Sequence, residues 1–286
     1  MSDEIIKKLE LQANVIRQSI IEMLVTAGSG HTAGPLGMAD IFTYLYFHEL
    51  KHDPKNPTWP ERDRLVLSNG HICPVFYATM AHAGYFDIKE LQTLRKFGTR
   101  LQGHPHREYL PMVENSSGPL GSGLSQAVGM ALADRIDHGQ KNDRFIYALM
   151  SDGELDEGNS WEGIMLAGKN QLGNLIAVVD RNNIQIDGYT ENIMPLEPLG
   201  AKWEAFNWHV IEVPGHDFTA LHEAVQTAKS IFNKPSVIIA KTIPGRGVPE
   251  FERDYLWHGK PPNKEEANMA LKELRTLGGK IKSEHQ

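Results

Sequence analysis

Apolar residues recur at helical spacing along the first part of the chain, with charged residues between them. The apolar positions are Leu9, Ala13, Ile16, Ile20 and Leu24. This period is typical of an amphipathic helix, which we expect to end at about Thr26. Because charges are interleaved throughout, the segment is unlike a signal peptide, and we expect no export.

Beyond about residue 145, short apolar runs alternate with helical segments. The predicted strands cover 145–150, 175–180, 208–213 and 235–243, and the helices between them cover 161–169 and 218–232. This alternation indicates right-handed strand-helix-strand crossovers. The sequence therefore predicts an α/β fold, a doubly wound and mainly parallel sheet flanked by helices.

Two glycine-rich segments lie in the first half of the chain. Residues 27–37 form a loop before a helix that we expect to begin at about Met38. Residues 116–134 form a loop that enters a helix of small residues, which can let another backbone approach closely. Between them lie the segment LVLSNGH at 65–71 and predicted helices at 77–83 and 88–97.

We find no internal repeat and no linker in the sequence. We therefore predict one domain over residues 1–286. From about residue 263 the chain is expected to form one short helix and then a polar tail.

Composition narrows the range of partners. The chain has 286 residues, of which 41% are hydrophobic, a formal net charge of −7, and no stretch apolar enough to span a bilayer. No basic run is interleaved with aromatic residues, so nucleic acid and anionic membranes are poor candidates for binding. The single cysteine, Cys73, excludes an intramolecular disulfide. We expect a soluble protein of the cytoplasm.

Two of the predicted strands end in oxygen-bearing side chains. Asp152 follows the strand at 145–150, and Asn182 and Asn183 follow the strand at 175–180. Open parallel sheets bind ligands at the carboxyl ends of their strands. A few hard oxygen donors leave most of an octahedral Mg²⁺ shell to phosphate oxygens and water. The pattern indicates a metal-diphosphate site, whereas Asp-Gly after a strand is by itself more often only a turn.

Seven motifs support this interpretation. In chain order they are GSGHTAGPLGMAD, ERDRLVLSNGH, GHP, SSGPLGSGLSQAVGMA, SDGELDEG, DRNNIQIDG and WHGKP. With them, residues 14–262 closely resemble the N-terminal, diphosphate-binding domain of transketolase. In thiamine diphosphate enzymes the fifth motif usually begins Gly-Asp-Gly, and Ser151 replaces the first glycine here. The resemblance implies the thiamine diphosphate-binding fold.

The resemblance also implies a set of cofactor-binding residues. The metal, Mg²⁺ with Ca²⁺ or Mn²⁺ as possible substitutes, would be bound by Asp152, Asn182 and the backbone carbonyl of Ile184. Gly153 would donate its N–H to the diphosphate of thiamine diphosphate. The other residues expected at the cofactor are His71, His258, Gly118 and Leu120.

Catalytic residues follow from the same resemblance. His104 would bind the first hydroxyl of the donor sugar, while His31 and His258 would handle the proton on the hydroxyl of its third carbon. A neutral imidazole can accept such a proton near physiological pH. Glu157 and Glu162 would join a carboxylate network between paired active sites. Alternatively, these two glutamates only place favourable charge near a helix N-terminus.

The expected reaction requires a second chain. In transketolases the glutamate that protonates the aminopyrimidine lies on a following pyrimidine-binding domain, which we do not expect in this chain. We therefore predict that this chain is the N-terminal subunit of a split transketolase. Two copies of it would assemble with two copies of a C-terminal partner subunit. The assembly would transfer a two-carbon ketol unit from a ketose phosphate to an aldose phosphate, as in pentose phosphate metabolism.

Two alternatives remain at this stage. One is a related thiamine diphosphate enzyme, similar to 1-deoxyxylulose-5-phosphate synthase or acting on non-standard sugars. The other is a non-catalytic subunit that binds the cofactor and regulates a partner.

Overall fold

The computed structural model describes residues 1–139 and 143–284, the side chain of residue 284 excepted. Its centre is a five-stranded sheet in the order β1-β2-β3-β7-β6, and all four strand pairs are parallel. The strands are β1 (Arg64–Leu67), β2 (Ile146–Ser151), β3 (Leu175–Arg181), β6 (His209–Pro214) and β7 (Ser236–Lys241). The predicted α/β class is confirmed.

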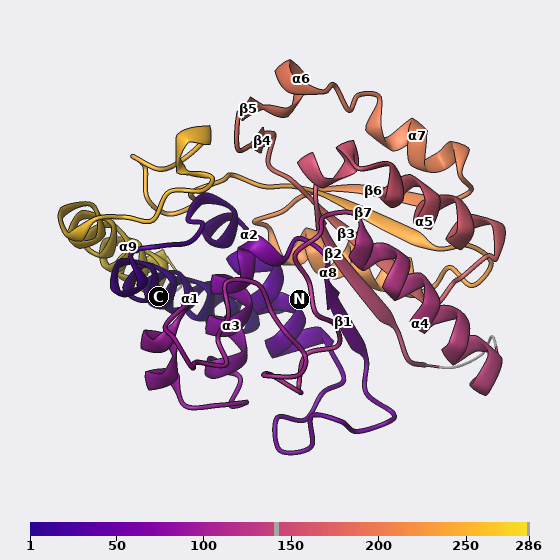
Figure 1. Cartoon of the computed structure of the whole chain (residues 1–286), viewed down its shortest axis with the longest axis horizontal. Coiled ribbons are helices and arrows are strands. Elements are labelled where there is room, and N and C mark those ends of the chain that lie inside the picture. Colours follow the sequence, from indigo (N-terminus) through magenta and orange to yellow (C-terminus); the bar gives the residue numbers. More distant parts are fainter. Residues whose placement is uncertain (140–142, 285–286) are drawn as a thin grey trace.

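Helices cover both faces of the sheet (Figure 1). On one face lie α1 (Asp3–Ala27), α2 (Ala33–Tyr44), α3 (Cys73–His82), α8 (Phe218–Lys229) and α9 (Lys264–Glu284). On the other lie α4 (Ser122–His138), α5 (Gly158–Lys169) and α7 (Leu199–Ala205). The fold is therefore a three-layered, doubly wound arrangement.

Each central strand contributes to two separate hydrophobic cores. In β3, Ile176 and Val178 pack in the core with α1 and α2, whereas Ala177 and Val179 pack in the core with α4 and α5. Successive strand residues point to opposite faces of a sheet. Because both faces are covered, the strand reads as a continuous apolar run rather than as an alternating one.

Shorter elements connect these layers. A two-stranded antiparallel hairpin, β4 (Ile184–Gln185) and β5 (Gly188–Tyr189), leads into the short helix α6 (Thr190–Ile193). A π-helical turn, η1, covers Leu45–Glu49. The 3₁₀ turns are η2 (Gly70–Ile72), η3 (Ile88–Thr93), η4 (Gly153–Asp156) and η5 (Tyr255–Trp257).

The first glycine-rich segment differs from the prediction, because α2 already begins at Ala33 and includes Gly34 and Gly37. A Cβ on Gly34 would lie 2.9 Å from the Ile72 side chain, and one on Gly37 would lie 3.0 Å from the Ile243 carbonyl oxygen. These glycines therefore allow close packing inside a helix rather than forming a loop.

Several other boundaries also differ. The segment at 65–71 contains the end of β1 and the start of η2, and the predicted helix at 88–97 is only the 3₁₀ turn η3. The helix α7 was not predicted, since its seven residues bury only Leu199 and Trp203 and give too short a periodic signal.

The C-terminal helix is longer than predicted. α9 has 21 residues, and its buried hydrophobic residues are Ala267, Ala270, Leu274 and Ile281. It packs along α1, where the Asn14 side chain donates to the Leu274 carbonyl at 2.9 Å. Within the described residues, no helix has a stretch long and apolar enough to cross a membrane.

Candidate active site

The candidate site lies at the carboxyl ends of three neighbouring strands. β1 is followed by Ser68 to His71, β2 by Asp152, and β3 by Asn182. Because the strands are parallel and adjacent in the sheet, their ends meet at one edge, where such folds bind ligands.

The loop after β3 is joined to the loop after β2 by a hydrogen bond from a backbone N–H to the Asp152 side chain. Asn183 adopts a left-handed conformation with φ 65°, which asparagine tolerates better than most residues. Its N–H donates to Asp152 Oδ2 at 2.7 Å, and the Ile184 N–H donates to Asn182 Oδ1 at 3.0 Å. The predicted metal ligands Asp152, Asn182 and Ile184 thus belong to one connected turn.

Two buried charged residues that the sequence analysis did not single out surround this turn. The Arg181 guanidinium donates to Asp152 Oδ2 at 3.0 Å, and Asn182 Nδ2 donates to Asp180 Oδ2 at 2.7 Å. Asp180 and Arg181 immediately precede Asn182 in the same motif, so two adjacent opposite charges at the end of a buried strand were the available signal. Asp180 also accepts a hydrogen bond from the Thr242 hydroxyl, at the end of β7.

Burial dominates the protonation of the two aspartates. It raises the pKa of Asp152 to about 6, although the Asn183 N–H and Arg181 oppose this shift. Burial also raises the pKa of Asp180 to about 7, and the negative charge of the neighbouring Asp152 contributes to this increase. Two buried carboxylates so close together favour the binding of a cation between or beside them.

The Gly153 N–H is already used in this structure. It donates to Asp152 Oδ1 at 2.8 Å, whereas the sequence analysis assigned it to the diphosphate. Asp152 thus accepts three hydrogen bonds, from Gly153, Asn183 and Arg181. The assignment of Gly153 to the cofactor stays a prediction.

Three of the four predicted histidines form a cluster opposite this turn. The His31 ring centroid lies 4.9 Å from that of His71 and 5.5 Å from that of His258, and the His71 and His258 centroids are 5.2 Å apart. They come from the loop before α2, from η2, and from the residue after η5. Three segments far apart in sequence therefore supply one cluster of imidazoles.

These imidazoles are neutral at physiological pH. Burial, followed by the neighbouring His258, lowers the pKa of His31 to about 4, and burial lowers that of His258 to about 4. Burial also lowers the pKa of His71 well below its ordinary value, and it lowers that of His104. The buried Nδ1 atoms of His31 and His258 have no hydrogen-bond partner among the described residues. Neutral imidazoles with free nitrogens can exchange protons with a bound ligand.

A cavity of about 360 Å³ connects the histidines to the metal-ligand turn. It is lined by His31, His71, His104, Gly118, Leu120, Ser151, Gly153, Glu154, Asp156, Glu157, Ile184, Gln185, Ile186 and His258. No lysine or arginine is among these described lining residues. Apart from the buried Asp152 and Asn182 and the exposed Glu162, every predicted site residue lines this cavity.

Glu154 is a second group that the sequence analysis missed. Its buried carboxylate accepts from the Gly121 N–H at 2.7 Å, from the Ser151 N–H at 3.2 Å and from the Ser68 hydroxyl. Ser68 in turn accepts from the Gly123 N–H at 3.0 Å. Glu154 therefore fixes the start of α4 beside the loop that carries Gly118 and Leu120. Its place two residues after Asp152 was the available signal.

The two glutamates predicted for the carboxylate network differ in position. Glu157 lines the cavity, whereas Glu162 is exposed on α5 outside it. Their proposed common role stays a prediction.

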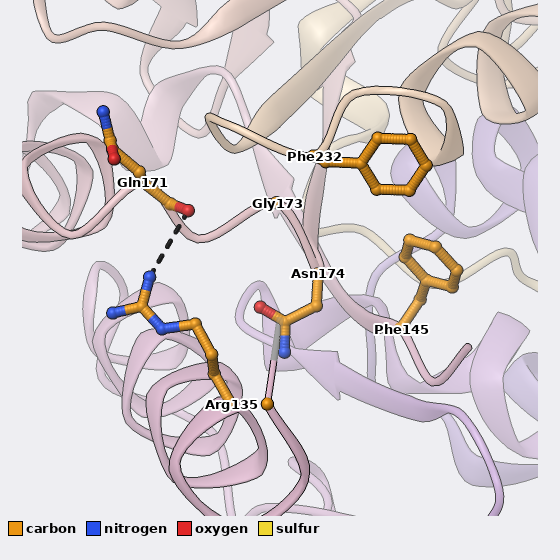
Figure 2. Close-up of a pocket in the computed structure, with 7 residues that line it drawn as sticks. Arg135, Phe145, Gln171, Gly173, Asn174 and Phe232 are labelled. Atoms are coloured by element: carbon orange, nitrogen blue, oxygen red, sulfur yellow. Dashed lines mark hydrogen bonds between the residues drawn. The ribbon is translucent and has the colours of Figure 1, made fainter. Parts of the chain in front are cut away.

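A smaller hollow lies at the opposite end of the sheet (Figure 2). It is lined by Arg135, Gly139, Phe145, Gln171, Gly173, Asn174 and Phe232 and holds only about 20 Å³. Arg135 donates to the Gln171 carbonyl at 3.5 Å across its edge. This volume suits a water molecule rather than a cofactor.

The larger cavity suits thiamine diphosphate and a divalent metal. Asp152, Asn182 and the Ile184 carbonyl are hard oxygen donors, and the described residues contain no cluster of three or more His, Cys, Asp or Glu that could bind a metal instead. A side chain on Gly118, whose φ is 155°, would approach the His104 ring at 3.8 Å. Glycine there keeps the backbone accessible from the cavity.

Comparison with known proteins agrees with this site. The family described as transketolase, thiamine diphosphate binding domain, matches residues 9–279. The 6-deoxy-6-sulfo-D-fructose transketolase subunit SqwG of Clostridium sp. (strain MSTE9) is 45% identical, and the match covers 94% of this chain and 97% of that protein.

A second relative and a solved structure extend the comparison. An apulose-4-phosphate transketolase subunit of Phocaeicola vulgatus is 36% identical, with 98% of both chains covered. The structure of transketolase from Leishmania mexicana superimposes with a TM-score of 0.85 at 32% identity, covering 97% of this chain but 45% of that one. The chain therefore belongs to the transketolase family and corresponds to its N-terminal, thiamine diphosphate-binding domain.

Proposed function

We propose that this chain binds the diphosphate half of thiamine diphosphate and, with a partner chain, transfers a two-carbon ketol unit from a ketose to an aldose. The observation that carries the proposal is that four neutral histidines line one cavity and face the turn of Asp152, Asn182 and Ile184. When bound, the cofactor supplies a carbon nucleophile and an electron sink.

The metal proposed for this site is Mg²⁺. Asp152, Asn182 and the Ile184 carbonyl would provide three oxygen ligands, and diphosphate oxygens and water would complete the octahedral shell. A carboxylate with a pKa of about 6 ionises readily when a divalent cation lies beside it. Ca²⁺ or Mn²⁺ would bind the same oxygens.

The histidines would divide the work between cofactor and sugar. His71 and His258 would contact the cofactor, and His104 would bind the first hydroxyl of the donor. His31 and His258 would hold and move the proton of the hydroxyl on the third carbon. The low pKa values of His31 and His258, about 4, keep both imidazoles available as proton acceptors.

A partner chain with a pyrimidine-binding domain would complete the site. The relatives named as transketolase subunits support this proposal, as does the 45% coverage of the longer transketolase. We propose two copies of each chain, with Glu157 and Glu162 facing the contact between sites. The buried, unpaired thiol of Cys73 suits the reducing cytoplasm.

The proposed substrates carry a terminal anionic group. The two relatives are named for a sulfonated and a phosphorylated sugar. The described cavity lining contains no lysine or arginine that could bind such a group, which supports an anion site on the partner. A non-standard sugar, with sulfonate or phosphate at its far end, is therefore an alternative to the pentose phosphates.

Reconstitution tests this function. We expect the purified chain with thiamine diphosphate and Mg²⁺ to show negligible ketol transfer, and the pyrimidine-domain partner to restore turnover. EDTA or Asp152→Ala should abolish the restored activity, because the diphosphate then lacks its metal. Robust activity from the single chain contradicts the need for a partner, and activity in the Asp152→Ala mixture contradicts the metal site.

A further inference from the structure

Arg181, the last residue of β3, joins the candidate metal site to a segment outside the cavity. Its Nη1 donates to Asp152 Oδ2 at 3.0 Å and to Thr190 Oγ1 at 2.9 Å. Its Nη2 donates to Glu191 at 2.7 Å and to Glu197 at 3.0 Å. The guanidinium therefore bridges Asp152 and the segment that follows the β4-β5 hairpin.

These contacts orient the Asp152 carboxylate. Oδ2 accepts both the Arg181 guanidinium and the Asn183 N–H, which together use its two lone-pair positions. Among the described residues, Oδ1 accepts a hydrogen bond only from the Gly153 N–H and retains one lone-pair position. Arg181 thus occupies one oxygen and leaves the other able to bind a cation.

The energetic effect of Arg181 falls mainly on Asp152. The Asp152 side chain is 0% exposed, whereas those of Glu191 and Glu197 are 39% and 60% exposed. Water can therefore solvate the two glutamates if Arg181 is removed, but it cannot reach Asp152. A buried carboxylate that loses its cation is strongly destabilised in its charged form.

We propose that Arg181 is a positioning residue for the metal-diphosphate site. It holds Asp152 in the orientation that presents Oδ1 to the metal, and Glu191 and Glu197 hold Arg181 in turn. The inference rests on the proposed function, because it takes Asp152 to be a metal ligand. Hydrogen-bond partners of metal-ligating groups typically contribute about ten- to a hundredfold to metal affinity.

The test measures Mn²⁺ affinity and does not depend on activity. Free Mn²⁺ is followed by electron paramagnetic resonance while the full chain, with its partner and thiamine diphosphate, is titrated. Arg181→Met should weaken Mn²⁺ binding about ten- to a hundredfold. Arg181→Lys keeps the charge but not the two-pronged geometry, so it should recover part of this loss. Glu191→Gln with Glu197→Gln should weaken binding less than Arg181→Met.

Arg144→Met is the matched control. Arg144 is also a buried arginine, paired with Glu61 and Asp134, but it precedes β2, at the end of the sheet opposite Asp152. We expect the Mn²⁺ affinity of the Arg144→Met variant to equal that of the wild type, even if thermal unfolding shows that the variant is less stable. A general effect of breaking a buried ion pair would instead weaken Mn²⁺ binding in both methionine variants.

The Mn²⁺ titrations distinguish a failure of the role of Arg181 from a failure of the proposed function. Unchanged or tighter Mn²⁺ binding by a folded Arg181→Met variant overturns the role of Arg181 alone. Absence of Mn²⁺ binding by the wild type removes the proposed function and this inference with it. If Arg181→Met does not fold, Arg181→Lys and the double glutamine variant decide the question by the same measurement.

Discussion

At the level of single residues, the proposed chemistry of the site depends on imidazoles that burial keeps neutral. His31, His71 and His258 lie within 5.5 Å of one another by ring centroid, and such proximity disfavours a second positive charge. His104 lines the same cavity but lies outside this cluster. We therefore expect His104 and His71 to contact different parts of the bound molecules.

Variants of these two histidines should therefore affect different ligands. His104→Ala should leave thiamine diphosphate binding nearly intact and lower kcat/KM for the donor about ten- to a hundredfold, since one hydrogen bond to a sugar hydroxyl is lost. His71→Ala should raise the cofactor concentration needed for activity. Separate titrations of cofactor and donor check both. If His104→Ala shifts only the cofactor curve, the two assignments are reversed.

The histidines should also make stability depend on pH. The pKa of His31 and of His258 is about 4 in the folded chain, against 6.5 as the ordinary value. As the pH falls below 6.5, the unfolded chain takes up protons before the folded one does, so the free energy of unfolding decreases until about pH 4. Lowering each pKa from 6.5 to about 4 corresponds to a decrease on the order of 3 kcal/mol for each histidine.

Urea unfolding at pH 7 and at pH 4.5 measures this effect. It compares the wild type with a double variant that carries His31→Asn and His258→Asn. The double variant should lose less stability between the two pH values than the wild type does. Asp152 and Asp180 titrate in both proteins, so their contribution cancels in the comparison. An equal loss in both proteins contradicts the lowered histidine pKa values.

At the level of elements, glycines set how closely helices approach the rest of the fold. Gly123, in the first turn of α4, lies where a Cβ would come within 2.5 Å of Ser68 after β1. This proximity lets Ser68 join the Glu154 network at the start of α4. Helix packing and the shape of the cavity are therefore linked through small residues.

Gly168, near the end of α5, gives a sharp test of this packing. A Cβ there would lie 1.8 Å from the Phe206 carbonyl oxygen, so Gly168→Ala should destabilise the chain by on the order of 3 kcal/mol. Gly129 in α4 has no atom within 4 Å of an added Cβ. Gly129→Ala should therefore stabilise the chain by about 0.5 to 1 kcal/mol. Chemical unfolding measures both, and equal effects contradict the packing argument.

At the level of the whole molecule, the sequence by itself determined the fold class and the family. Local periodicity reports which positions are buried, so the apolar runs after residue 145 predicted the parallel strands. The order of the motifs predicted the transketolase family. His71, Gly153 and Ile184 follow three adjacent strands and line one cavity, because strand ends of a parallel sheet meet at one edge.

Only the tertiary structure decided which distant groups meet. Nothing in local spacing places the loop before α2 beside the turn after η5, yet His31 and His258 lie 5.5 Å apart by ring centroid. Two further contacts join groups from different strands and loops. Arg181 pairs with Asp152, and Glu154 accepts a hydrogen bond from the Gly121 N–H at the start of α4. Periodicity records how each residue relates to its chain neighbours, whereas these contacts depend on how the crossovers stack helices on the sheet.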